Sequence, residues 1–184
     1  MDSRNYVLIP RKSNDEERAQ MQAWLLPLYD LLGTIMQEFR WKDDPSKILF
    51  VCDAEGNVTA NQMHMRHELR HEFMELMREQ IRAAPAVPRY AVFQSVMYRN
   101  NMLAPSAAPD EELILHLETP DSLVCALVAT IIRVRRQPPK LGPARFEFYE
   151  DVEKFQGAMI GFFLPRSSAF GEYGLPMPPS LFNR

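Results

Sequence analysis

The sequence predicts an α+β domain in which a small mixed sheet packs against two long helices, at about residues 14–40 and 62–82. Both segments repeat apolar residues at the helical period, and short runs of branched and aromatic residues surround them. The 184 residues, 46% hydrophobic and 24% charged, suit one globular domain, expected over residues 1–164. The 15 prolines exceed the 7 glycines, and several of them stiffen an extended tail predicted at residues 165–184.

The first predicted helix begins at Ser13, because Ser13-Asn14-Asp15-Glu16 has the form of a capping box. Its predicted inner face carries apolar residues at helical spacing: Met21, Trp24, Leu25, Leu28, Leu31, Leu32, Ile35, Met36 and Phe39. Pro27 lies within this stripe and has no backbone donor. We therefore expect a kink, or a break in the helix near residue 26.

Branched and aromatic runs predict strands at residues 6–9, 47–52, 58–60, 90–98, 113–117 and 145–149. Thr119-Pro120-Asp121 looks like a helix start, with a cap, a first-turn proline and an acid, and predicts a helix through about Arg135. The valine and isoleucine content of this segment favours a strand instead. A further short helix is expected over residues 152–163.

The chemistry of the whole chain points to a soluble intracellular protein. Cys52 and Cys125 lie in apolar runs, so we expect buried, reduced thiols. The amino terminus lacks the apolar core of a signal peptide, and the longest uncharged apolar stretch, residues 122–132, is too short to cross a bilayer. A net charge of -3 gives no overall attraction for nucleic acid, which is not expected as a partner.

Three of the four histidines lie in one short window of the second predicted helix. There His67-Glu68-Leu69-Arg70-His71 resembles the His-Glu-x-x-His motif of zinc metallopeptidases. The resemblance implies that His67 and His71 bind zinc while Glu68 activates the bound water. The third ligand would be His116, which lies in a predicted strand, or His64. No cofactor is expected for the chain unless this motif binds metal, in which case the cofactor would be zinc.

Helical geometry also allows a plainer interpretation of this window. At about 100° per residue, one face carries Leu69, Phe73, Leu76, Met77 and Ile81, and the opposite face carries His64, His67, His71, Glu75 and Arg78. The second face has the composition of a solvated surface, or of an adventitious metal site. His71 and Glu75 are also spaced as an ordinary i,i+4 pair.

A second motif overlaps the first. Arg66 and His71 have the Arg-x4-His spacing and resemble the Arg-polar-x-x-x-His motif of HEPN ribonucleases. The resemblance implies an all-helical dimer that cleaves RNA with these two residues.

A basic cluster spans the end of the helix predicted through about Arg135 and the residues after it: Arg133, Arg135, Arg136, Lys140 and Arg145. A contact with phosphate or nucleic acid would use such a cluster. The preferred interpretation is a solvated patch, because basic residues are favoured at the carboxyl terminus of a helix.

The tail combines apolar anchors with prolines, unlike most disordered tails. The expected partner-binding residues are Phe170, Tyr173, Leu175, Pro176, Pro178, Pro179, Leu181 and Phe182. Because proline favours extended geometry, less entropy is lost on docking. The sequence therefore predicts a non-catalytic interaction or structural subunit of a larger assembly, whose partners are other protein subunits or a second copy of the chain. A zinc hydrolase is the alternative and a HEPN-like ribonuclease the third.

Overall fold

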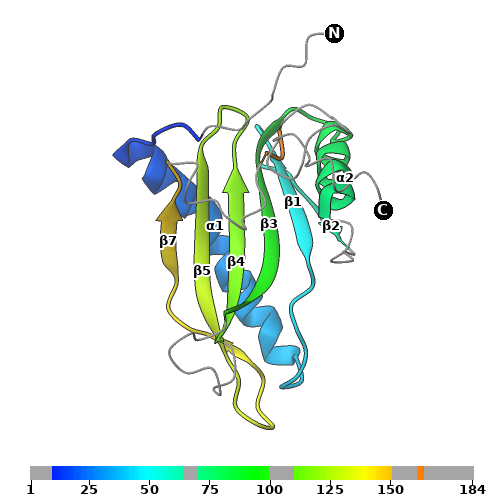
Figure 1. Cartoon of the computed structure of the whole chain (residues 1–184), viewed down its shortest axis with the longest axis vertical. Helices are drawn as coiled ribbons and strands as arrows, with labels where there is room; N and C mark the ends of the chain where they lie inside the picture. The colour runs from blue at the N-terminus through cyan, green and yellow to red at the C-terminus, as the bar shows by residue number, and fades with distance from the viewer. Residues whose placement is uncertain (1–9, 64–69, 100–109, 151–160, 164–184) are drawn as a thin grey trace, which may run out of the picture.

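The computed structural model describes residues 10–63, 70–99, 110–150 and 161–163. In chain order its elements are α1 (Asp15–Ile35), the 3-10 turn η1 (Met36–Glu38), β1 (Ile48–Asp53), β2 (Val58–Gln62), α2 (Arg70–Arg82), β3 (Pro88–Arg99), β4 (Asp110–Glu118), β5 (Val124–Ile132), β6 (Lys140–Leu141) and β7 (Arg145–Phe148). The α+β class is confirmed (Figure 1). Within the described ranges only α1 is a long helix, which corrects the expectation of two.

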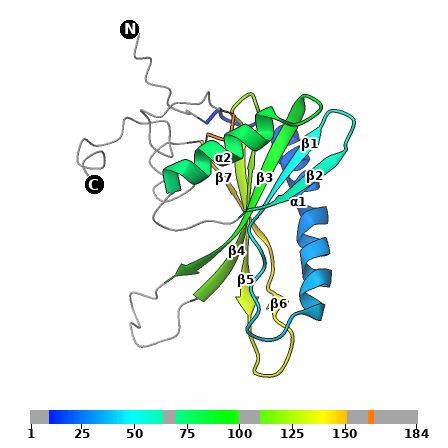
Figure 2. The same cartoon turned by 90° about the vertical axis from the view of Figure 1, so that its right-hand side faces the viewer.

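The strands form one seven-stranded sheet in the order β2-β1-β3-β4-β5-β6, and β7 also pairs with β5. Every pairing among the described strands is antiparallel, so the expected small mixed sheet is wrong in both size and direction. Tight turns join β1 to β2 and β4 to β5, and such turns can only place neighbouring strands antiparallel. The curled sheet separates α1 from α2, as Figure 2 shows.

The helix expected from residue 120 to Arg135 is wrong, because this segment forms β5. Most of β5 is buried on both faces, and a strand covered on both sides is a continuous apolar run that hides the two-residue period. The cap-like residues form the preceding turn instead: the Thr119 hydroxyl accepts the N–H of Leu123 at 3.0 Å. Ser122 closes the turn with a positive φ of 69°.

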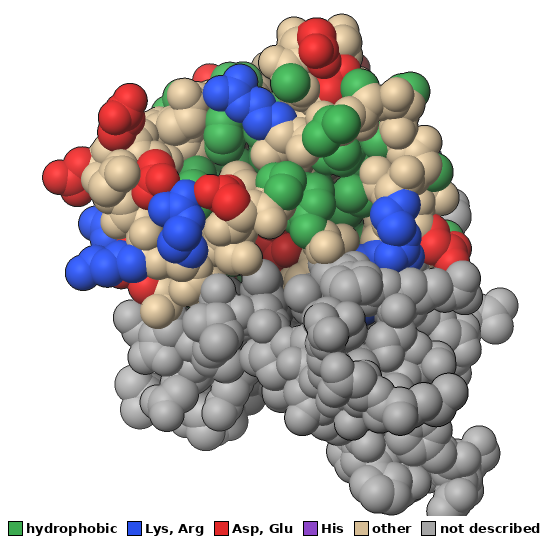
Figure 3. All heavy atoms as spheres, turned by 90° about the horizontal axis from the view of Figure 1, so that it is seen from above, with side chains coloured by type: hydrophobic (Ala, Val, Ile, Leu, Met, Phe, Trp, Pro, Cys, Tyr) green, Lys and Arg blue, Asp and Glu red, His purple; other side chains and the backbone are tan. Residues whose placement is uncertain are grey.

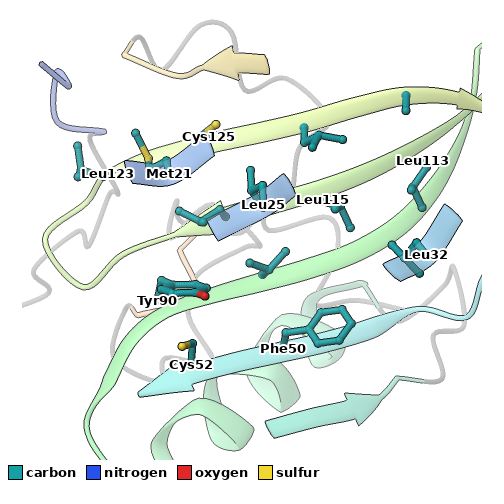
Figure 4. Packing of buried hydrophobic residues seen from close by; sticks show 14 of the residues in the cluster. Met21, Leu25, Leu32, Phe50, Cys52, Tyr90, Leu113, Leu115, Leu123 and Cys125 are labelled. Carbon is teal, nitrogen blue, oxygen red and sulfur yellow. The ribbon is translucent and has the colours of Figure 1, made fainter. Parts of the chain in front are cut away.

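The larger core, here the α1-side core, lies between α1 and one face of the sheet. Met21, Leu25 and Leu32 of α1 pack against residues such as Leu115 and Tyr90, and each of these is at most 9% exposed (Figure 4). Trp24 stacks on Tyr90 with ring centroids 4.4 Å apart. This burial, rather than intrinsic helix propensity, is the main source of α1 stability.

Two details of α1 differ from the sequence-based expectation, and a third decides between its two alternatives. Asn14, not Ser13, is the N-cap: its side chain accepts the N–H of Glu17, whose carboxylate accepts the N–H of Asn14. Of the kink or break expected at Pro27, the break does not occur, because the helix continues through this residue. Leu31 and Ile35 are 50% and 42% exposed, because the apolar arc of α1 is wider than the sheet surface that it covers.

The second face of the sheet carries α2 and a smaller core, the α2-side core. It contains Leu49, Val51, Met63, Met77, Ile81, Ala91, Phe93 and Phe162. The predicted helix boundary at residue 62 is wrong, because β2 extends to Gln62. Arg78 was predicted on the solvated face of this helix but is 2% exposed, so its side chain lies in the protein interior. Residues 161–163 are not helical, and the rest of the helix expected over residues 152–163 lies outside the described ranges, as does the strand expected at residues 6–9.

A group of polar contacts, here called the polar clasp, joins the start of α1 to the β4–β5 turn and to the residue Glu150 after β7. Glu150 accepts hydrogen bonds from the Ser13 hydroxyl at 3.0 Å and from Arg18 at 2.8 Å. Arg11 joins Glu17 to Asp121 with contacts of 2.8 and 2.6 Å. The Arg18 contact, with a smaller contribution from Ser13, lowers the pKa of Glu150 from 4.5 to about 2.

The clasp predicts a pH dependence of stability. A carboxyl whose pKa is lower in the folded state stabilises the fold above its unfolded-state pKa, and this contribution disappears as pH falls through the folded-state value. We therefore expect the urea midpoint of unfolding to be higher for wild type than for Glu150→Gln above pH 4.5. This difference should disappear as the pH falls from 4.5 to 2. Midpoints measured across that range check this, and a pH-independent difference would contradict the assignment.

Substitution of glycine by alanine is expected to have opposite effects on stability at two positions. Gly33 lies in α1 and Gly56 in the β1–β2 turn with a φ of +87°, and an added Cβ meets no atom within 4 Å at either position. Gly33→Ala should stabilise the protein by about 0.5–1 kcal/mol, because alanine loses less entropy in a helix. Gly56→Ala should destabilise it by about 1 kcal/mol, because a Cβ disfavours positive φ. Chemical unfolding of both variants measures the two signs.

Candidate functional site

The described residues contain only part of the His-rich site that the sequence predicted. His64, Arg66, His67 and Glu68 lie outside the described ranges. His71 lies in α2. His116 lies on β4 and is 5% exposed. Among the residues that the structure describes, no three His, Cys, Asp or Glu side chains are grouped to hold a metal ion.

His116 belongs instead to a buried polar cluster on the α2 side of the sheet. Side chains two positions apart on a strand share a face, so His116 and Glu118 lie together. Nε2 of His116 is 3.3 Å from Oε1 of Glu118, and Glu118 is 1% exposed. A carboxylate this deeply buried requires compensating hydrogen bonds.

The compensating hydrogen bonds come from the chain's own backbone near its carboxyl end. The N–H groups of Gly161 and Phe162 donate to the two oxygens of Glu118 at 2.6 and 2.7 Å. From α2, Nε of Arg78 donates to the carbonyl of Gly161 at 2.7 Å. We call this arrangement of Glu118, Arg78 and His116 around residues 161–162 the backbone clamp.

The backbone conformation and the burial of the clamped segment explain why it contains a glycine and a phenylalanine, Gly161 and Phe162. Gly161 has a φ of +89°, which glycine adopts at no steric cost and which lets two consecutive N–H groups face one carboxylate. Phe162 is 1% exposed and lies edge-on to the His116 ring, with centroids 5.4 Å apart. The segment is therefore held both by charge-assisted hydrogen bonds and by burial in the α2-side core.

Tyr149 also lies close to the imidazole of His116. Its ring centroid is 6.1 Å from that of His116, and its hydroxyl donates to Glu147 at 2.9 Å. Burial raises the pKa of Tyr149 well above its usual range, and the nearby Glu147 carboxylate adds to the effect. The tyrosine therefore stays neutral and acts here as a hydrogen-bond donor.

The described part of the cluster holds a peptide backbone but brings no activated nucleophile to it. Both cysteines are buried in the α1-side core, on the opposite face of the sheet. Burial raises the pKa of Cys125 to about 12, so its thiol stays protonated at neutral pH. A thiol, unlike a thiolate, is a poor nucleophile.

Sequence reasoning selected His116 but missed the residues with which it acts. Glu118 had a local signal, because it directly follows the strand predicted at residues 113–117, and one more residue of strand puts it on the same face as His116. Arg78 and Gly161 had none, because each is identified only by its contact with a distant part of the chain. The tail residues expected to bind a partner, within 165–184, lie outside the described ranges.

Nothing among the described helices is both long and apolar enough to span a lipid bilayer. Comparison of the chain with family models, with curated proteins and with solved structures finds no match. The function is therefore inferred from the chemistry of the described residues.

Proposed function

We propose that the chain is a non-catalytic interaction or structural subunit of a larger assembly, and that it docks partly through residues 165–184. The observation that carries the proposal is the backbone clamp. Its buried charges are engaged by Gly161 and Phe162 of the same chain, so they act as structural anchors. They hold the chain in place immediately before the tail, so a docking segment would leave the domain from a fixed point.

A second observation adds to the proposed interaction surface. Residues 161–163, orange in Figure 1, lie at the end of the sheet where β3 begins. At this end Val58 is 53% and Val87 81% exposed, and Figure 3 shows hydrophobic side chains gathered between charged ones. Exposed apolar residues bordered by charge are typical of protein interfaces.

The direct test compares the full chain with one that ends at Pro165, which keeps the clamp. We expect the full chain to form a complex of defined mass, with itself or with a stoichiometric subunit from its native source, and the shorter chain to be a monomer. Light scattering after chromatography measures the masses, and urea unfolding should differ by less than about 1 kcal/mol. A monomeric full chain without a stoichiometric partner would refute the proposal.

A matched pair of tail variants separates anchoring from tail length. Phe170→Ala combined with Tyr173→Ala and Phe182→Ala removes the aromatic anchors, and should abolish assembly. Ser167→Ala combined with Ser168→Ala and Ser180→Ala changes the same number of positions without removing an anchor. Equal assembly by both variants would exclude the proposed anchors.

A zinc hydrolase that uses His67 and His71 as ligands and Glu68 as base is the alternative. One observation favours it: His116, its predicted third ligand, lies on the sheet face that α2 covers. Elemental analysis after zinc loading should then find one zinc per chain, lost in His67→Ala and reduced in His116→Ala. Absence of bound zinc in the loaded wild type would remove this alternative.

The HEPN resemblance implied an all-helical domain, and the seven-stranded sheet departs from that expectation. RNA cleavage that is abolished by His71→Ala would be needed to retain it.

A further inference from the structure

The hairpin between β5 and β6, residues 133–139, is a projecting surface element. Figures 1 and 2 show it extending below the rest of the sheet. The N–H of Gln137 donates to the carbonyl of Val134 at 3.0 Å, which closes a turn. Arg135 and Arg136 occupy the centre of this turn, so both exposed cations lie at its tip.

The charge at this tip is positive and uncompensated within the described structure. No acidic residue occurs between Asp121 and Glu147. Arg133, at the base of the hairpin, is paired with Glu111 and Asp44. In contrast, Arg135, Arg136 and Lys140 are exposed and form no ion pair with any described residue.

The structure also removes the ordinary explanation for this basic cluster. A helix ending near Arg135 would favour cations at its carboxyl terminus, but the preceding segment is strand β5. Moreover, Arg136 has a φ of +67°, a conformation that favours glycine or asparagine. Arginine is less favourable than glycine in this backbone conformation, so turn formation alone does not explain why an arginine is present here. A function of its side chain would explain it.

Apolar side chains accompany the cations and indicate the class of partner. Ile132 and Val134 are each 47% exposed, on either side of Arg133. The hairpin has no aromatic residue on which nucleic-acid bases could stack. Exposed aliphatic residues among cations suit the interface of a bilayer, where the cations meet lipid phosphates and the aliphatic groups enter the headgroup region.

We infer that the β5–β6 hairpin is a peripheral docking site for an anionic lipid surface. Arg135, Arg136 and Lys140 bind the headgroups, and Ile132 and Val134 enter the interface. The site is independent of the tail.

Vesicle co-sedimentation tests the inference. At low salt the full chain should bind phosphatidylcholine vesicles that contain phosphatidylserine, and bind pure phosphatidylcholine much more weakly. Combined Arg135→Glu and Arg136→Glu should weaken binding at least about 25-fold, about fivefold for each cation lost. Combined Lys12→Glu and Arg82→Glu is the control, because it changes the net charge equally at two other exposed positions and should retain binding within about threefold.

Two single variants separate the site from a general charge effect. Arg136→Gly relieves the positive φ, so thermal stability should be unchanged or higher while vesicle affinity falls about fivefold. Val134→Ser should weaken vesicle binding without changing the net charge. The chain that ends at Pro165 should bind vesicles like wild type, which keeps this test separate from the test of the tail.

Three results would overturn the inference. The first is no binding of wild type to phosphatidylserine vesicles at low salt. The second is equal binding by wild type and the doubly reversed variant. The third is binding to single-stranded RNA in preference to vesicles, unaffected by Val134→Ser, which would identify the hairpin as a nucleic-acid contact.

Discussion

Glu118→Ala is expected to destabilise the protein by about 2–5 kcal/mol, because it removes the buried carboxylate that accepts hydrogen bonds from two backbone N–H groups. The free energy of unfolding is obtained from urea titrations followed by circular dichroism. Because the clamped segment leads into the tail, limited proteolysis should also cut the variant faster after residue 160. The two readouts together test the clamp as an anchor.

Glu118→Gln is the matched control for shape. Its side chain has the same size and one carbonyl oxygen, so it keeps one of the two accepting atoms without the charge. We expect a smaller loss of stability than in Glu118→Ala and an intermediate rate of cleavage. A change below about 1 kcal/mol in Glu118→Ala would mean that the clamp does not contribute to folding.

Leu25→Ala is expected to destabilise the protein by about 2–5 kcal/mol, whereas Leu31→Ala in the same helix should change stability by less than about 0.5 kcal/mol. The substitutions are chemically identical and both lie in α1. They differ in burial: Leu25 is fully buried between α1 and the sheet (Figure 4), whereas Leu31 is 50% exposed. Leucine and alanine have similar helix propensities, so the difference reports packing.

Thermal and urea unfolding of the two variants measure this difference. A loss of similar size in both would show that the outer side of α1 is buried in solution by self-association, which light scattering would detect. Neither variant touches the clamp, so the result is independent of Glu118→Ala.

Local signals in the sequence identified most of the strands and the two described helices, α1 and α2. The apolar period of α1 predicted Met21, Leu25 and Leu32 as core residues, and all three are buried. The runs that became β1, β3 and β4 were also recognised. These elements were predictable because a repeating pattern of side chains over several residues decides which backbone geometry can bury them.

β5 shows where the local signals fail. Its cap-like start at Thr119 and its continuous apolar run are compatible with a helix, and the competing β propensity of its valines and isoleucines is a weaker signal. The neighbouring strands β4 and β7 decide in favour of a strand, since they satisfy its backbone on both edges. The partners of a strand cannot be read from the strand itself.

The sequence by itself determined the α+β class, the inward face of α1 and the positions of the β1, β3, β4 and β7 strands, because these depend on neighbours a few residues away. Only the tertiary structure decided what His116 touches. Glu118 meets the Gly161 N–H across 43 positions, and Arg78 meets its carbonyl across 83. Such contacts form when the sheet brings distant segments together and buried charges must find partners there.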